Sequence, residues 1–484
     1  MNSRDLLSTS FALTMIRNMQ RMFFPPLLSA VLLIGLCQQG RAQYEALELG
    51  PEEPATPALP TGGATLFQNV RIFDGKNAAL SAPSNVLVKG NTIEQISANA
   101  AAPEAGANVR VINANGRVLM PGLIDAHWHM FMAAASPAII TTADPGYLNL
   151  LAAQQAEATL MRGFTTIRDM GGPVFGLKRA IDEGVAVGPR IYPSGAMISQ
   201  TSGHGDFRAR YEVPRSLGGP LSQSEIAGIA AIADSPDEVR LRAREQLRQG
   251  ASQIKLMAGG GVSSQHNPIE STQFTEAELR AAVEAAENWG TYVAVHAYTP
   301  AAIRQAIAAG VKCIEHGQLI DEPTAKLLAD KGIWWSLQPL TYDAAVFARM
   351  SPVSQKKALE VFAGTENAYK VAKKYSIKTA WGADILGDAG AASRQGQYLA
   401  LMVRWYTPAE ALKMATADNG ELMALSGFIN PYPGKLGVVE IGALADLLLV
   451  DGNPLEDINL VANPHKNFVV IMKDGKIYKN TLSK

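Results

Sequence analysis

Two histidines two positions apart, His127 and His129, are the residues of this sequence best placed for metal chemistry. They close the run Pro121-Gly122-Leu123-Ile124-Asp125-Ala126-His127-Trp128-His129, in which apolar residues lead into the pair as in a buried parallel strand. Side chains of a strand alternate between faces, so residues i and i+2 point the same way. Two imidazoles on one face can bind one divalent cation. A lone His-x-His also fits a pair of ordinary polar residues at a strand end, so the motif needs support from elsewhere in the chain.

Four more ionisable residues lie in or at the ends of apolar runs. Taken singly, each has a structural explanation: a strand-end histidine can be merely hydrogen-bonded, a lysine can pair with an acid, and an aspartate can cap the next helix. A buried ammonium beside several imidazoles needs a further reason, because lysine is rarely buried without a partner. We therefore predict that these residues form one cluster with the histidine pair: Lys255 inside 253–257, His296 at the end of 291–296, His316 at the end of 313–316 and Asp384 at the end of 380–384.

The elements that must position these residues are apolar strands alternating with amphipathic helices. This alternation predicts an α/β fold with eight β–α units, a (β/α)8 TIM-like barrel, whose strand C-termini converge on one mouth where active sites lie. An open doubly wound sheet is the alternative, but no Gly-x-Gly-x-x-Gly turn follows the first strand. The predicted strands are 122–129, 163–169, 190–197, 253–258, 291–298, 313–317, 334–339 and 379–385.

Three of the intervening helices begin with a predicted capping box, in which a hydroxyl caps the first turn and a glutamate three residues later reaches back. Pro236 and Pro408 fit the first helical position, where a missing N–H is harmless. The predicted boxes are Ser235 with Glu238, Thr275 with Glu278 and Thr407 with Glu410.

Short alternating strands flank the barrel region at both ends, in 66–75, 85–90 and 109–112 and again in 446–451 and 468–478. They predict a small discontinuous β-sandwich domain formed by both ends of the chain. We assign 63–120 and 434–484 to this domain and 121–433 to the barrel.

The N-terminus has the pattern of a secretory signal over residues 1–42, with arginines, an apolar stretch and Gly40-Arg41-Ala42 before a cleavage point. Residues 43–62 form a Pro-rich linker or arm. We expect an exported protein, periplasmic or secreted, without stable membrane insertion after signal removal. Cys37 sits in a poor lipidation context and would leave with the signal, so only Cys313 would remain. A net charge of -1 without a long basic block argues against nucleic acid as a partner.

From about Thr65 to the C-terminus the sequence resembles the amidohydrolase superfamily, in its imidazolonepropionase-like branch. The resemblance rests on the run 122–129, on Lys255, His296, His316 and Asp384, and on the tail 434–448. That branch includes Xaa-Pro dipeptidases, carboxypeptidase-type N-acyl-amino-acid hydrolases and ochratoxin-hydrolysing enzymes. The resemblance implies two divalent metal ions, usually zinc: His127, His129 and Asp384 would hold one, His296 and His316 the other, and carbamylated Lys255 would bridge them. Relatives also tend to form closed homo-oligomers.

The chemistry agrees with this assignment. A carbamate replaces a cation-repelling ammonium by an anionic ligand, and two metal ions can lower the pKa of a bridging water and polarise a carbonyl. Asp384 would act as general base and then as general acid toward the departing amine. Deaminases of the superfamily typically lack the lysine, so Lys255 favours amide hydrolysis. We expect cleavage of N-acyl amino acids or dipeptides with a free C-terminal carboxylate, such as Xaa-Pro or ochratoxin A-type substrates.

Two alternatives remain open at this point. The same site could hydrolyse a lactone, a cyclic amide or an organophosphate. A non-catalytic interaction module with the same fold would have no need to keep all six ligands.

The long segment after the third strand, beginning Gln200-Thr201-Ser202-Gly203-His204, is of a length that usually serves function. In the resembled branch the histidine of this run and the tyrosine after the fifth-strand histidine contact the substrate, which here are His204 and Tyr298. Arg208 could bind a carboxylate bidentately, although a solvated loop charge is the simpler explanation. The apolar loop 130–135 could accept a bulky acyl group.

Overall fold

The computed structural model describes residues 63–98 and 109–482. The predicted signal (1–42) and arm (43–62) therefore lie outside the described residues. Within the described ranges, no helix combines the length and the apolarity needed to cross a bilayer.

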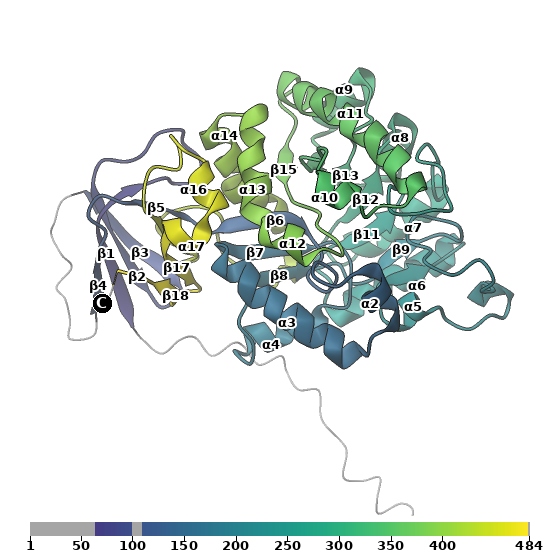
Figure 1. The fold of residues 1–484 in the computed structure, drawn as a ribbon, viewed down its shortest axis with the longest axis horizontal. Helices are drawn as coiled ribbons and strands as arrows, with labels where there is room; N and C mark the ends of the chain where they lie inside the picture. Colours follow the sequence, from purple (N-terminus) through teal and green to yellow (C-terminus); the bar gives the residue numbers. More distant parts are fainter. Residues whose placement is uncertain (1–62, 99–108, 483–484) are drawn as a thin grey trace, which may run out of the picture. The chain divides into compact units, whose positions relative to one another are not determined.

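Eight parallel strands form the predicted barrel (Figure 1). One group runs β6-β7-β8 and the other contains β11-β12-β13-β14-β15, with neighbours joined by parallel ladders. The two groups meet where Ser252 N–H donates to Pro193 O at 2.7 Å. The barrel strands are β6 (Leu123–Trp128), β7 (Phe164–Asp169), β8 (Arg190–Pro193), β11 (Ile254–Met257), β12 (Val293–Ala297), β13 (Cys313–His316), β14 (Trp334–Leu337) and β15 (Thr379–Trp381).

Side chains complete the barrel between β15 and β6. Asn419 Nδ2 donates to Ile124 O at 2.7 Å and to Trp381 O at 2.8 Å, so one amide joins both strands. Asp125 Oδ1 accepts from Ala383 N at 3.2 Å. Buried polar groups of a strand need partners, and here a side-chain network supplies them. The closure sets the first and last strands of the barrel side by side at the rim.

The predicted strand 190–197 is wrong in one respect, because it is broken after Pro193. Gly195 has a left-handed φ of 72°, which interrupts an extended strand. The chain resumes as β9 (Met197–Ser199), which pairs with β11 and with β10 (Ala230–Ile232), a strand that the sequence did not reveal.

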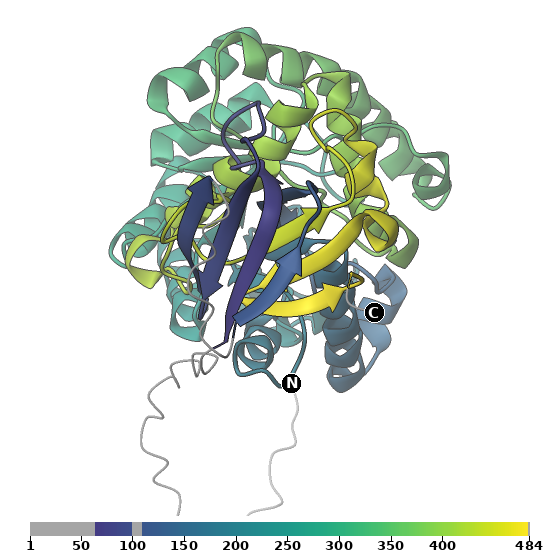
Figure 2. The same cartoon turned by 90° about the vertical axis from the view of Figure 1, so that its left-hand side faces the viewer.

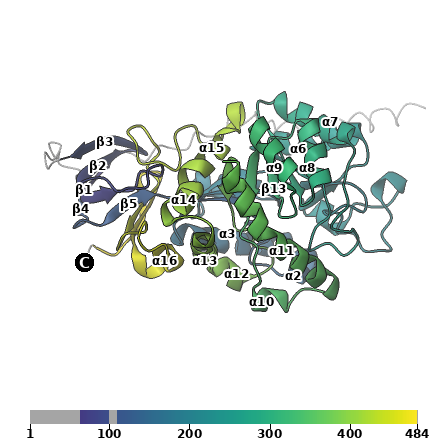
Figure 3. The same ribbon diagram turned by 90° about the horizontal axis from the view of Figure 1, so that it is seen from above.

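Helices surround the barrel strands, and α6 to α9 lie side by side outside the half of the barrel that contains β11 and β12 (Figure 3). Apolar side chains between strands and helices form the main core. The α-helices are α2 (Pro137–Thr142), α3 (Pro145–Met161), α4 (Phe175–Asp182), α5 (Gln223–Ile226), α6 (Pro236–Gln249), α7 (Glu276–Glu287), α8 (Pro300–Ala309), α9 (Glu322–Lys331), α10 (Ala344–Phe347), α11 (Pro352–Lys374), α12 (Ala389–Ser393), α13 (Gln395–Ala400), α14 (Pro408–Lys413), α15 (Asn419–Ala424), α16 (Asn459–Ala462) and α17 (Pro464–Asn467). Shorter turns are η1 (Arg215–Leu217), η2 (Leu401–Arg404), the π-helical η3 (Met414–Asp418) and η4 (Gly427–Ile429).

Two of the three predicted capping boxes are confirmed, at Thr275 and Thr407. At the third, Ser235 accepts from Glu238 N, but the box is not reciprocal. The Glu238 carboxylate instead accepts from Asp234 N at 2.8 Å, one residue before the cap. The cap itself is retained, since the hydroxyl still satisfies a free N–H of the first turn.

Both ends of the chain build the second sheet, as predicted (Figure 2). Its order is β18-β17-β16-β5-β1-β2-β3, with β4 paired to β1. The strand β1 belongs to both halves of the sheet, because it pairs with β2 and β4 along most of its length and with β5 at Arg71 and Ile72. One buried apolar cluster contains side chains of both halves, including Val86 and Leu449. The strands are β1 (Ala64–Ile72), β2 (Ser84–Lys89), β3 (Thr92–Ala98), β4 (Val109–Asn113), β5 (Val118–Pro121), β16 (Leu447–Val450), β17 (Phe468–Lys473) and β18 (Lys476–Asn480).

A buried ion pair joins this sheet to the barrel. Arg190 of β8 binds Asp446 through Nε and Nη2 at 3.0 and 3.2 Å, and its Nη2 also lies 2.6 Å from Asp474. Such forked contacts fix orientation as well as distance. The pair lies at the start of its barrel strand, on the face opposite the mouth.

Candidate metal centre

The carboxylate of Asp384, just after β15, is the point at which the predicted cluster converges. Its Oδ1 lies 3.4 Å from His127 Nε2 and 3.3 Å from His129 Nε2, and its Oδ2 lies 3.7 Å from His316 Nδ1. The alternation of β6 explains the first two contacts, because it turns both histidines to the same face. The closure of the barrel places Asp384 beside these histidines, since Asp384 N–H donates to His127 O at 2.8 Å.

The remaining histidines continue this group along the rim. The ring of His316 lies 4.9 Å from that of His127 and 4.4 Å from that of His296, measured between centroids. These residues come from β6, β12 and β13, which are far apart in the sequence. Their ring spacing shows that the carboxyl ends of the strands meet at one site.

Two of the clustered residues have a left-handed backbone: φ is 74° at His316 and 49° at Asp384. Such angles are uncommon for residues other than glycine and are found preferentially at functional sites. His316 is the last residue of β13, and Asp384 follows the end of β15.

Each of the four histidines has one ring nitrogen bound to a protein oxygen, and a carboxylate or carbonyl oxygen can only accept. His127 Nδ1 therefore donates to Glu315 Oε2, at 2.7 Å. By the same reasoning His129 Nδ1 donates to Gly171 O, His296 Nε2 to Gly260 O and His316 Nδ1 to Gln338 Oε1, at 3.1, 3.0 and 2.8 Å. The other nitrogen of each ring keeps its lone pair, which is the arrangement of metal-binding histidines.

Glu315 and Arg168 support His127 and were missed in the sequence. Arg168 Nη2 lies 2.7 Å from Glu315 Oε1, and both side chains are fully buried. Arg168 and His127 outweigh the effect of burial and hold the pKa of Glu315 well below its usual range. The sequence did contain a signal for both residues, because a charged residue inside an apolar strand must have a partner. The sequence did not show that Arg168 and Glu315 are partners of each other.

Lys255 of β11 is buried and, among the residues that the structure describes, has no hydrogen bond or ion pair. Burial lowers the pKa of this ammonium to about 8, although Glu315 and Asp384 oppose the shift. Its positive charge in turn contributes to lowering the pKa of His127, His204, His296 and His316. Lys255 therefore shares an electrostatic environment with the whole cluster.

Burial also keeps four of the imidazoles neutral. It lowers the pKa of His127 to about 4 and that of His204 to about 3, and it holds the pKa of His296 and His316 well below the usual value. Burial alone would raise the pKa of Asp384, but His127, His129 and His316 outweigh it and hold that pKa well below the usual range. At neutral pH these four imidazoles are neutral and the carboxylate is ionised, the states that bind metal.

His204 and Tyr298 lie against the cluster. The ring of His204 is 4.3 Å from that of His296, and its buried Nδ1 has no partner in the described residues. The ring of Tyr298 is 5.0 Å from His296 and 5.2 Å from His316. Both aromatic side chains are placed to contact a molecule held at the cluster.

Arg208 is neither solvated nor free. Its Nε and Nη2 bind Asp206 at 2.8 and 2.6 Å, and both side chains are largely buried. Its Nη1 is buried without a partner in the described part of the chain. Binding of a substrate carboxylate by Arg208 would have to use this nitrogen or displace Asp206, and it stays a prediction.

The donors present suit a divalent metal ion of the zinc type. His127, His316 and Asp384 offer ligand atoms that all lie within 4.8 Å of one another. Nitrogen and carboxylate oxygen are zinc ligands. The orientation of each imidazole by a protein acceptor is a second, independent point of agreement, since metal-bound histidines show the same arrangement.

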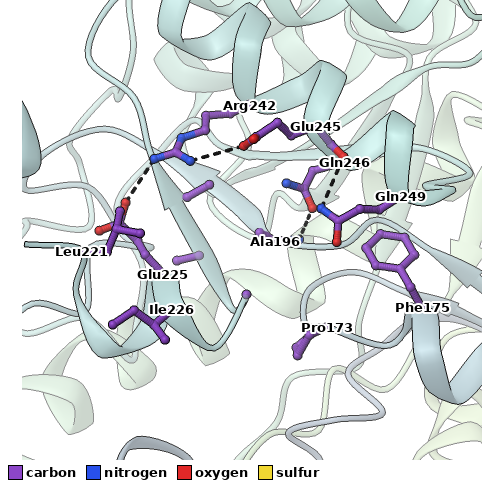
Figure 4. Close-up of a pocket in the computed structure, with 13 residues that line it drawn as sticks. Pro173, Phe175, Ala196, Leu221, Glu225, Ile226, Arg242, Glu245, Gln246 and Gln249 are labelled. Carbon is purple, nitrogen blue, oxygen red and sulfur yellow. Dashed lines mark hydrogen bonds and ion pairs between the residues drawn. The ribbon is translucent and has the colours of Figure 1, made fainter. Parts of the chain in front are cut away.

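A separate cavity of about 240 Å³ lies outside this cluster, beside β10 and α6 (Figure 4). Arg242 on its wall is paired with Glu225 at 3.4 Å and Glu245 at 3.3 Å. Its lining includes none of the predicted metal or substrate residues. We assign it no role in the chemistry.

Comparison with known proteins decides the family. A sequence model of a protein family, described as "Amidohydrolase family", matches residues 118–479, which include every clustered residue. The chain belongs to the amidohydrolase family. An ochratoxinase of Aspergillus niger is 33% identical over 374 residues, covering 75% of this chain and 76% of the relative.

Solved structures of the same family agree. A prolidase complexed with N-methylphosphonate-L-proline superposes with a TM-score of 0.79 at 34% identity, covering 86% of this chain and 100% of that one. A Xaa-Pro dipeptidase with methionine bound in its active site gives a TM-score of 0.74 at 29% identity, covering 86% and 100%. This amidohydrolase is thus a hydrolase related to ochratoxinase and to prolidases.

Proposed function

We propose that this amidohydrolase uses two divalent metal ions, most simply zinc, to cleave the amide bond of N-acyl amino acids or dipeptides with a free C-terminal carboxylate. The observation that supports it best is the convergence of three imidazoles on Asp384, at 3.3 to 3.7 Å. His127, His129 and Asp384 would hold one ion, and His296 and His316 the other. When bound, such ions lower the pKa of water and polarise a carbonyl.

Asp384 is the residue that would move the proton. The carboxylate is ionised at neutral pH, so it can accept a proton from the attacking water. The same oxygen would then deliver that proton to the nitrogen of the departing amine. We expect Asp384→Asn to lose at least about 10²-fold in kcat, the lower end of what a positioned acid–base group contributes. Asp321→Asn, an exposed helix cap that asparagine fills equally well, is the control.

Lys255 would act as a carbamate bridging the two ions. The charge balance supports this: an unpaired ammonium would repel cations, whereas a carbamate is an anionic ligand with two oxygens. Incubation with ¹³C-bicarbonate should give a carbamate resonance in the ¹³C NMR spectrum that Lys255→Ala lacks. The same variant should lose metal and activity. Full activity in Lys255→Ala would refute the assignment.

The substrate class comes from the relatives and from the aromatic side chains beside the cluster. Relatives are named ochratoxinase, prolidase and Xaa-Pro dipeptidase, and the prolidase was solved with a proline analogue. In this chain His204 and Tyr298 would contact the amino-acid part, and the buried loop 130–135 would line the acyl side. A panel of N-acyl amino acids varied at both ends, with matched esters and a lactone, tests the class. Higher kcat/KM for amides supports the proposal, and a preference for the lactone or a phosphotriester supports the alternative.

We further propose that the protein is exported, on the N-terminal sequence alone. Mass spectrometry of the secreted or periplasmic protein should give an N-terminus at Gln43. An N-terminus at or near Met1 on the intracellular protein would contradict export. Homo-oligomer formation also stays a prediction, and light scattering on the purified protein tests it.

A further inference from the structure

The loop that follows β11, residues 258–273, is closed upon itself beside the metal centre. Gln273 N–H donates to Ala258 O at 2.8 Å, and Gly260 N–H donates to Ser271 O at 3.1 Å. Gly259 and Thr272 form an antiparallel bridge between these bonds. The loop therefore has a paired base, while the segment between 261 and 268 has to be held by other contacts.

Two rings of the site depend on this loop for their position. Gly260 O accepts from His296 Nε2 at 3.0 Å. Gly261 packs directly on the imidazole of His204, so closely that a Cβ at this position would overlap the ring. Gln273 Oε1 accepts from the backbone N–H of His204 at 2.8 Å. A shift of the loop would thus move a predicted metal ligand and a predicted substrate contact together.

Lys357, on α11, binds the segment between residues 261 and 268. Its buried Nζ donates to the backbone carbonyls of Gly261, Ser264 and Asn267, at 3.2, 2.6 and 2.5 Å. An ammonium has three N–H donors, and all three are used here. In the described residues Lys357 forms no ion pair. Its charge is stabilised by the three carbonyl dipoles of this loop and, without direct contact, by the carboxylates of Glu270 and Glu360. Charged donors make stronger hydrogen bonds than neutral ones.

We propose that Lys357 is a positioning residue for the metal centre, acting through loop 258–273. It orders the segment so that Gly260 O orients His296 and Gly261 supports His204. With every donor engaged by the backbone, it has none left for a substrate carboxylate. The consequences for zinc affinity and for catalysis rest on the proposed function, but the ordering of the loop and of His296 does not.

The test compares Lys357→Met, which keeps the length of the side chain without its donors, with Lys356→Met. Lys356 is the exposed neighbour on the same helix. In Lys357→Met we expect faster hydrogen–deuterium exchange across 258–273 with unchanged protection of β11 and β12. We also expect zinc affinity to fall about 10-fold, the lower end for loss of a group that orients a ligand. The kcat/KM for an N-acyl amino acid should fall by up to about 10²-fold, as for misplacement of a site residue. Lys356→Met should match the wild type in all three.

Wild-type exchange of the loop in Lys357→Met would overturn the proposal, and so would a loosened loop with wild-type zinc affinity. If Lys357→Met does not fold, Lys357→Gln, which keeps two N–H donors, takes its place and the same two readouts decide. If the wild-type protein cleaves none of the amides, the proposed function fails by itself. Exchange and zinc affinity still decide the role of Lys357, because neither depends on turnover.

Discussion

At the scale of single residues, the proposed metal centre depends on the contact that each histidine makes with its second ring nitrogen. One nitrogen donates to a fixed protein oxygen, so the ring cannot rotate and its lone pair points in one direction. Imidazoles held in these orientations need little reorganisation to accept a cation. The acceptors are thus as much a part of the site as the ligands.

Glu315→Gln tests this view at the most strongly bound ring. Glutamine keeps the shape but offers His127 Nδ1–H a neutral acceptor, and it removes the charge facing Arg168. We expect zinc affinity to fall about 10- to 100-fold, the range for loss of a partner of a metal-bound histidine. Competition with a chelator measures it, and Glu322→Gln on the surface of α9 is the control. Unchanged zinc affinity in Glu315→Gln would mean that this contact has no part in metal binding.

At the scale of elements, the loops after the barrel strands set the geometry of the site, and glycines allow the closest approaches. Gly382 lies so near β6 that a Cβ would be 2.5 Å from His127 N. Gly261 approaches the His204 ring in the same way. Neither glycine has a positive φ, so close packing rather than backbone conformation explains the residue type.

Gly261→Ala therefore tests the placement of His204. The new methyl group must displace the imidazole, while the backbone conformation suits alanine. We expect kcat/KM to fall about 10- to 100-fold, mainly through a higher KM, because a displaced contact misplaces the substrate. The melting temperature should change little. Gly176→Ala in α4, where a Cβ meets nothing within 4 Å, should leave kcat/KM unchanged. An equal KM in both variants would remove His204 from the substrate site.

The sequence predicts those features whose physical cause lies within a few neighbouring residues. The His127-x-His129 spacing and the capping threonines act over a few residues, so they could be recognised directly. The break of the third strand at Gly195 also has a local cause, but a single glycine does not reveal the sign of φ. The pairing of Arg168 with Glu315 spans 147 residues and depends on packing, so the sequence could indicate only that each needs a partner.

At the scale of the whole molecule, the N- and C-terminal strands form one sheet that contacts the barrel at the start of β8. Arg190 and Asp446 are both buried in this contact. Removing one partner of a buried pair leaves the other charge uncompensated, which costs about 3 to 5 kcal/mol. We expect Arg190→Met to lose about that much unfolding free energy in urea, while the folded fraction keeps its kcat/KM.

Lys326→Met is the control, because its pair with Asp330 is exposed and should contribute at most about 1 kcal/mol. Equal unfolding free energies for the two variants would show that the Arg190 pair does not stabilise the fold. A large loss of kcat/KM in Arg190→Met would show that the sheet influences the barrel mouth.

Stability of the metal-free protein should fall as pH decreases from about 5.5 to 4.5. Burial depresses the pKa of His127, His204, His296 and His316, so these four groups bind protons only in the unfolded state in this range. Burial raises the pKa of Asp125 and Asp169 to about 7, so these two bind protons only in the folded state. Four protons against two leave the unfolded chain with an excess of about two. The unfolding free energy should then fall by roughly 2 to 3 kcal/mol per pH unit.

Urea titrations of chelated protein across this range measure the slope. A free energy of unfolding that is flat or rises toward pH 4.5 would show that the imidazoles are already protonated in the folded state. Saturating zinc should make the fall steeper, because acid must then also release the metal.

The most direct test of the two-metal centre is anomalous diffraction from crystals grown with zinc. We expect two peaks about 3.5 to 4 Å apart. One should contact His127, His129 and Asp384, the other His296 and His316, with density for a carbamate on Lys255 between them. Absence of zinc at this rim, or a single ion beside an unmodified Lys255, would contradict this expectation.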